Sequence, residues 1–237
     1  MTTATEAQKE HRVIDRETYL NPPVPTGVDL THVPLVEATN ESLKEVGCIV
    51  EDPDEFTVEN GRFEIVPWPQ PGWRALDPGT GVEGGTTEGG FRLFWENGHL
   101  MGENLALATK ANQYLLAFGS IPGHDQSPDE VGKIVHVWYS DYHCDGGQLF
   151  FSTDSPIVAN LAPPVGDDVK PSDFTAFYFA PGTGLYIHPG VWHNAVYVTS
   201  ENGPATIFGR QGRVHPRVSV RWADEFNTVL RVPLILP

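Results

Sequence analysis

The feature that most limits what this chain can fold into is a succession of short apolar segments from Phe56 onward. Each segment is rich in Val, Ile, Phe, Tyr and Trp and stops at Gly, Pro, Asn or Asp, which is typical of strands separated by turns. The segments are RFEIVPW, GFRLFWENG, HLMGENLALA, YLLAFGSI, KIVHVWYSDYH, QLFFSTD, FTAFYFAP, GLYIHPG, AVYVTS, ATIFGR, RVSVRW and VLRVPLIL. So many short strands predict an all-β fold, either a barrel or a sandwich.

The composition is that of a globular protein with a strongly acidic surface. Hydrophobic residues make up 40% of the chain, and 15 Lys and Arg against 31 Asp and Glu give a formal charge of −16. Such a surface repels nucleic acid and anionic membranes, so we expect neither as a partner. The acidic surface does not exclude a small anionic substrate. Salt screens the distant surface charges beyond roughly 10 Å, so arginines gathered in a cleft can still attract such a substrate at close range.

The ends of the sequence suggest one domain preceded by an arm. Residues 1–28 are polar and end in a proline-rich stretch, which predicts an extended N-terminal arm able to wrap a second copy in a homodimer. Residues 29–237 contain no linker-like segment, so we expect a single β-barrel domain.

Two local patterns stand out inside this domain. The best helical pattern lies over residues 34–50, with Asn40 as the N-cap and Gly47 as the stop, and predicts a short peripheral helix. The glycine-rich stretch from Gly79 to Gly90 predicts a mobile loop at the mouth of the barrel.

Cysteine usage and hydropathy indicate the compartment. Cys48 and Cys144 are far apart and form no CxxC pair, which favours a reducing environment. The N-terminus has no signal-peptide core, and no apolar run approaches the roughly 18 residues of a membrane span. We therefore expect a cytoplasmic protein.

The residues most suited to chemistry lie in two stretches about forty positions apart. Asp141 and His143 are two apart on a predicted strand and face the same side, Gln148 returns to that side after a Gly-Gly turn, and His193 follows a Pro-Gly turn after His188. Asp141, His143, Gln148 and His193 are thus a candidate ligand set for Mn, Fe(II), Ni or Zn inside the barrel. No P-loop and no G-x-S-x-G motif is present, and no G-x-G-x-x-G follows a predicted strand, so we expect no organic cofactor.

Each of these residues also has a structural interpretation. His188 and His193 could be core residues bonded to backbone carbonyls, Asp141 could cap a turn, and Gln148 could be a structural amide partner. In the same way, Glu96-Asn97-Gly98 is interpreted as a β-hairpin turn.

Both stretches resemble the motifs of the cupin family. Pro189-Gly190-Val191-Trp192-His193-Asn194 is similar to the second cupin motif, in which a turn leads to a metal-binding histidine. The stretch from Asp141 to Gln148 is similar to the first motif, with Asp141 where the first histidine would stand. The resemblance implies a double-stranded β-barrel, or jelly roll, with a few short peripheral helices.

A narrower resemblance is to the ureidoglycolate lyase family, itself cupin-shaped. It covers roughly residues 33–237, and Asn194 stands where the family often has a second consecutive histidine. The stretches that carry it are VPLVEATNESLKEVGCIVEDP, HCDGGQLFF and GLYIHPGVWHNAVY. This resemblance implies cleavage of a C–N bond in a small hydroxy-carboxylate, with glyoxylate and urea as products of purine degradation.

Such a reaction needs proton transfer and a grip on a carboxylate. His143, His188 and His193 are the catalytic candidates, because imidazole titrates near neutrality. A carboxylate favours bidentate arginine. The predicted substrate-binding residues are Trp192, Arg210 and Arg213, ahead of Arg217 and Arg221.

Two other functions fit the same residues. A metal-dependent cupin dioxygenase or isomerase would use Asp141, His143, Gln148 and His193 as a ligand shell with open positions. A cupin that binds a small carboxylate without turnover would have the same barrel but no catalytic activity.

Overall fold

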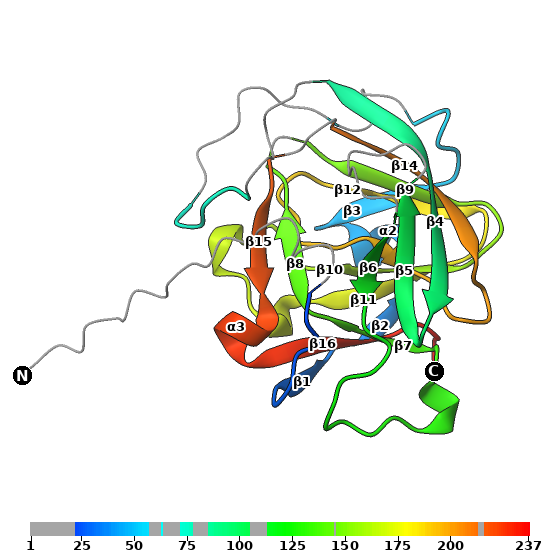
Figure 1. Cartoon of the computed structure of the whole chain (residues 1–237). Helices are drawn as coiled ribbons and strands as arrows, with labels where there is room; N and C mark the ends of the chain where they lie inside the picture. The colour runs from blue at the N-terminus through cyan, green and yellow to red at the C-terminus, as the bar shows by residue number, and fades with distance from the viewer. Residues whose placement is uncertain are drawn as a thin grey trace, which may run out of the picture.

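The computed structural model describes residues 22–56, 63, 72–77, 85–104, 113–144, 146–212 and 216–237. Strands dominate these residues (Figure 1), so the prediction of a mostly β fold is confirmed. The α-helices described are α2 (Asn40–Leu43) and α3 (Trp222–Phe226). The 3-10 turns described are Pro128–Glu130, Gly166–Asp168 and Pro171–Asp173.

The largest sheet contains seven strands in the order β3-β12-β9-β14-β4-β5-β6. All its strand pairs are antiparallel. Its strands are β3 (Gly47–Val50), β4 (Thr86–Glu96), β5 (His99–Asn104), β6 (Gln113–Ala117), β9 (Gln148–Ser152), β12 (Thr183–Ile187) and β14 (Ala205–Gly212).

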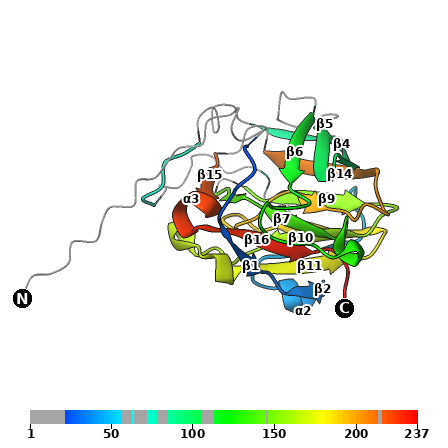
Figure 2. The same cartoon turned by 60° about the horizontal axis from the view of Figure 1, so that its bottom comes forward.

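Three smaller sheets accompany it, in the orders β13-β10-β11-β2, β1-β16-β7 and β15-β8. Their strands are β1 (Asp29–His32), β2 (Leu35–Glu37), β7 (Ile134–Val137), β8 (Tyr139–Tyr142), β10 (Ile157–Leu161), β11 (Thr175–Phe179), β13 (Val196–Tyr197), β15 (Val218–Arg221) and β16 (Thr228–Pro233). Figure 2 shows β4, β5, β6 and β14 on one side of the molecule and β10, β11 and β16 on the other. Within the described residues none of the four sheets closes on itself.

The main core joins these sheets. Phe91 of β4 packs edge-to-face on Phe150 of β9, with ring centroids 5.7 Å apart. The same buried cluster takes in Ile157, Phe177 and Leu230 from the smaller sheets. Each such side chain contributes roughly 1.5–3 kcal/mol by leaving water, so the sheets are held mainly by apolar burial.

The helix expected over residues 34–50 is a single turn, α2. Thr39 caps it, because its Oγ1 accepts from the N–H of Ser42 at 3.0 Å while the Ser42 Oγ accepts from the N–H of Thr39 at 2.9 Å. The prediction of Asn40 as the N-cap was therefore wrong by one position, since Asn40 is the first helical residue.

Gly47 and the glycine-rich stretch also differ from expectation. Gly47 begins β3 instead of ending a helix, and a Cβ there would lie 2.2 Å from the carbonyl oxygen of Tyr186, so close strand pairing requires glycine. Residues 86–90 of the predicted loop belong to β4, because they pair along β14. Residues 78–84 lie outside the described residues.

The predicted hairpin is confirmed. Asn97 and Gly98 have φ of 50° and 77° and connect β4 to β5, with Glu96 opposite His99. Two consecutive positive φ values are the geometry that Asn-Gly adopts most easily in a two-residue hairpin loop.

Most of the predicted N-terminal arm, residues 1–21, lies outside the described residues. The chain joins the sheets at β1, which pairs in parallel with β16. The homodimer that the arm was expected to serve stays a prediction. None of the helices in the described part of the chain has the length and apolar character that a bilayer crossing requires.

Candidate metal centre

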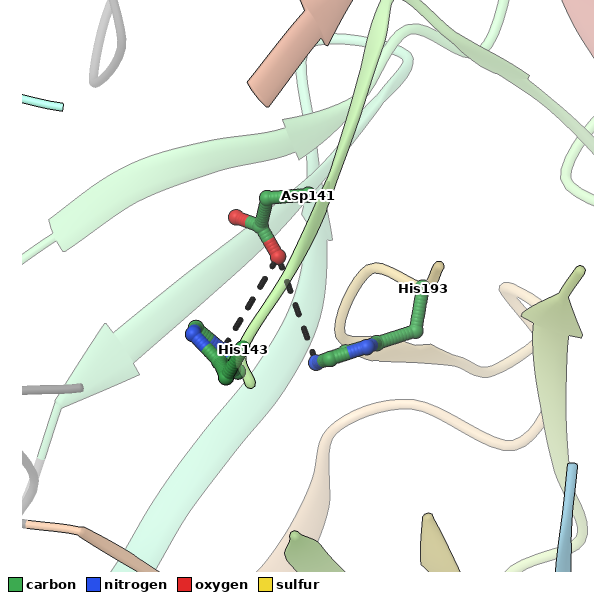
Figure 3. A group of neighbouring side chains, drawn as sticks. All are labelled: Asp141, His143 and His193. Atoms are coloured by element: carbon green, nitrogen blue, oxygen red, sulfur yellow. Dashed lines mark ion pairs between the residues drawn. The ribbon is translucent and has the colours of Figure 1, made fainter. Parts of the chain in front are cut away.

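The site is built on one hydrogen-bonded pair of residues from distant parts of the chain. The N–H of Asp141 in β8 donates to the carbonyl of His193 at 3.0 Å, and the N–H of His193 donates back at 2.8 Å. Residues paired in this way face the same side, and His143 lies two positions beyond Asp141, so all three side chains share one face. We refer to Asp141, His143 and His193 as the triad (Figure 3).

The triad side chains point at one another from two segments of the chain (Figure 3). Oδ1 of Asp141 lies 4.0 Å from Nε2 of His143 and 3.9 Å from Nε2 of His193. One ligand atom from each residue lies within 4.8 Å of the others, and all three residues are buried. The structure therefore brings imidazoles 143 and 193 together beside Asp141, and their roles in metal binding or catalysis stay predictions.

The turn before His193 also forms as predicted. Pro189 and Gly190 occupy its central positions, Gly190 has φ +83°, and the N–H of Val191 donates to the carbonyl of His188 at 3.3 Å. This is the arrangement in which proline and glycine are favoured. Gly190 also donates its N–H to the carbonyl of His143 at 2.5 Å, which ties the turn to the end of β8.

Alternate residues on the same two segments anchor them in the core. The rings of Tyr142 and Trp192 lie 4.6 Å apart, and Trp192 is fully buried. The Trp192 indole donates to the carbonyl of Gly166 at 2.7 Å, and the Tyr142 hydroxyl donates to Oδ1 of Asp167 at 2.5 Å. Trp192, predicted to bind substrate, therefore lies on the face away from the triad and holds its strand in place.

Backbone carbonyls orient both imidazoles. Nδ1 of His143 lies 3.2 Å from the carbonyl oxygen of Pro216, and Nδ1 of His193 lies 2.7 Å from that of Val191. A carbonyl oxygen only accepts, so each Nδ1 carries the hydrogen and a neutral ring keeps its lone pair on Nε2. Both Nε2 atoms are thereby prepared as ligands, in the way carbonyls prepare metal-binding histidines.

Gln148 adds a further oxygen to the cluster. Its Oε1 lies 3.0 Å from Nε2 of His193, and its Nε2 donates to Oε1 of Gln211 at 2.5 Å. With the His193 proton on Nδ1, the lone pair on Nε2 faces this amide across 3.0 Å, and a bound cation, an extra proton on the ring or a 180° rotation of the amide would each satisfy the contact. Adjacent ligands in an octahedral shell with bonds of about 2.1 Å have this separation.

The donor set fits a divalent ion. The point in the plane of the three triad atoms that is equidistant from them lies no more than about 2.5 Å from each, against the 2.0–2.2 Å of imidazole and carboxylate ligands. Small side-chain rotations that move each ligand atom by a few tenths of an ångström would bring these distances to the usual bond lengths. Two imidazoles, a carboxylate and an amide oxygen suit Mn, Fe(II), Ni or Zn.

Burial sets the charge of the acidic member. Removal from water raises the pKa of Asp141 to about 7, the Arg217 guanidinium opposes this rise, and the Asp77 carboxylate adds to it. Nε of Arg217 lies 3.6 Å from Oδ2 of Asp141 but donates to Oδ2 of Asp77 at 2.7 Å. The Ser219 hydroxyl donates to the same Asp77 oxygen at 2.5 Å.

Two other predicted residues lie away from the triad. The ring of His188 packs against Tyr186, and Arg210 pairs with Glu88 at 2.8 Å. Tyr186 and Arg210 are both strand partners of Leu149, so they share the face of the seven-stranded sheet opposite to Gln148. Arg213, the other arginine predicted to bind substrate, lies outside the described residues.

Sequence reasoning undervalued Arg217 and missed Asp77 and Gln211. The sequence did carry a sign of the position of Arg217. This residue directly precedes β15 and lies two positions before Ser219, and residues two apart on a strand share a face. Only the pairing of β15 with β8, which sets Ser219 opposite Asp141, shows that this face is the triad's. Asp77 had no such signal, because it belongs to no strand.

No protein-family model matches the chain, and no curated protein is significantly similar to it. The resemblance to ureidoglycolate lyases therefore stays a prediction that rests on the motifs quoted above.

Proposed function

We propose that this chain is a divalent-metal-dependent enzyme built on a cupin jelly roll, and that it cleaves a C–N bond in a small ureidoglycolate-like hydroxy-carboxylate. One observation carries the proposal. The Nδ1 atoms of His143 and His193 face carbonyl oxygens, while their Nε2 atoms face the Asp141 carboxylate. Buried imidazole nitrogens and a buried carboxylate that converge in this way form a donor set suited to a divalent cation.

In this proposal each residue has a defined task. Nε2 of His143, Nε2 of His193 and Oδ1 of Asp141 would hold a divalent ion, and Oε1 of Gln148 would offer a fourth ligand. When bound, such an ion would supply polarisation of the substrate's hydroxyl and carboxylate oxygens. Burial of the triad keeps competing water away and strengthens these interactions, and Arg217 offsets part of the negative charge.

The reaction follows from the substrate class. The carbinol hydroxyl loses its proton, the C–N bond breaks with its electron pair going to nitrogen, and that nitrogen takes up a proton. Glyoxylate and urea leave, and no oxidant is consumed. The motifs that favour this reaction over others on the same fold are HCDGGQLFF and the histidine-containing stretch from Gly184 to Tyr197.

A second function, an Fe(II) dioxygenase, is favoured by the ligand types themselves. Two histidines and one carboxylate, here His143, His193 and Asp141, form the donor set of non-haem iron oxygenases with open positions. Such an enzyme would consume oxygen, which the lyase would not.

The test is metal reconstitution followed by assay. Protein stripped with chelator and reloaded separately with Mn, Ni, Zn or anaerobic Fe(II) should release glyoxylate and urea from ureidoglycolate without oxygen, and His193→Gln should abolish both metal retention and turnover. His188→Gln is the matched control, because this histidine belongs to the same turn but packs against Tyr186, and it should stay close to wild type.

The other outcomes also discriminate. Full activity in the stripped protein would overturn the metal centre and assign proton transfer to His143 and His193. Oxygen consumption with iron would favour the dioxygenase, and tight carboxylate binding without product in any metal form would leave a binding protein.

A further inference from the structure

We infer that Asp77 is a positioning residue that holds Arg217 away from Asp141 and thereby keeps the Asp141 carboxylate available to a metal ion. This inference rests on the proposed metal centre and assigns control of metal affinity to a residue outside the triad. It is carried by the unequal sharing of one guanidinium between two buried carboxylates.

The sharing is seen in the distances. Nε of Arg217 donates to Oδ2 of Asp77 at 2.7 Å, a short charge-assisted hydrogen bond, and lies 3.6 Å from Oδ2 of Asp141, beyond hydrogen-bonding range. Both carboxylates are buried, with side-chain exposures of 2% for Asp77 and 8% for Asp141. Arg217 therefore interacts with Asp141 through its charge, whereas its Nε hydrogen bond is made to Asp77.

Asp77 is itself fixed against this arginine from two further directions. The Ser219 hydroxyl donates to the same Oδ2 of Asp77 at 2.5 Å, and the N–H of Asp77 donates to the carbonyl of Arg217 at 2.8 Å. The carboxylate cannot swing aside without breaking its hydrogen bonds from Arg217 and Ser219, and the backbone bond fixes the position of Asp77 beside Arg217. Asp77 is therefore held in one position, and its hydrogen bond with Arg217 fixes the position of the guanidinium.

Asp141 uses its two oxygens differently as a result. Oδ1 faces Nε2 of His143 and Nε2 of His193, and Oδ2 faces Arg217. If the guanidinium closed onto this carboxylate, it would form a direct ion pair that competes with a divalent ion for the same group. Neutralising Asp77 would favour that movement, because a charged acceptor binds a guanidinium about twice as strongly as a neutral amide.

The experiment compares metal affinity across a double-mutant cycle. Binding of Mn²⁺ and Zn²⁺ to chelator-stripped protein is measured by calorimetry for wild type, Asp77→Asn, Arg217→Gln and the double variant. Asp77→Asn should bind about 10- to 100-fold more weakly, as is typical when a residue supporting a metal ligand is lost. Arg217→Gln should bind at least as tightly as wild type, and the double variant should recover to the level of Arg217→Gln.

A matched control separates positioning from loss of structure. Glu225→Gln also removes a carboxylate from a buried arginine, since Glu225 pairs with Arg74 at 2.7 Å, but it leaves Arg217 untouched. It should lower thermal stability and leave metal affinity unchanged. A crystal structure of Asp77→Asn should show Nε of Arg217 within hydrogen-bonding distance of Asp141.

Each remaining outcome overturns a specific statement. Unchanged affinity in Asp77→Asn, or a double variant as weak as Asp77→Asn, overturns the positioning role and leaves the metal centre standing. If Asp77→Asn does not fold, weaker binding by Arg217→Gln alone does the same. No metal binding by wild type overturns the proposed centre, and this inference with it.

Discussion

Metal binding to the triad should depend steeply on pH in a defined direction. Burial raises the pKa of Asp141 to about 7 in the metal-free protein, so half of the molecules must release a proton at that pH before the carboxylate can bind an ion. Below pH 7 each further unit should weaken binding about tenfold through this one group, or about 1.4 kcal/mol. Above pH 8 the contribution of Asp141 should be flat.

Calorimetry in buffers of different ionisation enthalpy measures the proton directly. From a pKa of about 7, Asp141 alone should release about 0.9 proton per metal ion at pH 6 and about 0.1 at pH 8. Asp141→Asn should bind metal far more weakly and lose the Asp141 share of the released protons.

The reasoning fails if wild-type affinity is the same at pH 6 and pH 8, because the metal would then not displace a proton from a buried carboxyl. It fails equally if Asp141→Asn retains the full proton release. His188→Gln is again the control, and its pH profile should overlay that of wild type.

Two further predictions concern stability. Burial, together with the nearby Arg231 charge, lowers the pKa of His136 from 6.5 to about 4, so folding favours the neutral ring. The stability that this ring contributes is present above pH 6.5 and is lost as pH falls through 4. In urea unfolding, wild type should therefore lose about 3 kcal/mol relative to His136→Leu over that range. Parallel curves for the two proteins would contradict it. Tyr142→Phe removes the buried hydroxyl that donates to Asp167, and should lower the free energy of unfolding by about 1.5–3 kcal/mol with less than a tenfold change in metal affinity, because Tyr142 faces away from the triad. Equal stability of variant and wild type would contradict this assignment.

The sequence pattern identified most of the triad because its members obey local rules. Asp141 and His143 share a face through the two-residue period of a strand, and Pro189-Gly190 marks a turn that glycine alone adopts without strain. The hairpin at Asn97 follows from the same kind of rule. The length of the helix was overestimated. Capping residues and acidic residues mark where a helix begins, but they do not show whether it continues beyond one turn, which depends on tertiary packing.

Local rules could not choose among the arginines and histidines. Arg210 and the neighbouring Gln211 point to opposite faces of β14, and a shift of one residue in strand register would exchange them. His188 and His193 both flank the predicted turn, yet only His193 is paired with Asp141. These assignments depend on contacts between segments far apart in the chain.

What the amino-acid sequence determined by itself was the kind of local structure: strand periodicity, turn positions, an acidic surface and a pair of ligand residues on one strand. The tertiary structure alone decided which strand lies beside which, and therefore that Arg217 and Asp77 adjoin Asp141. The physical reason is that backbone geometry fixes alternation over a few residues, whereas pairing between distant strands is selected by the burial of the whole core.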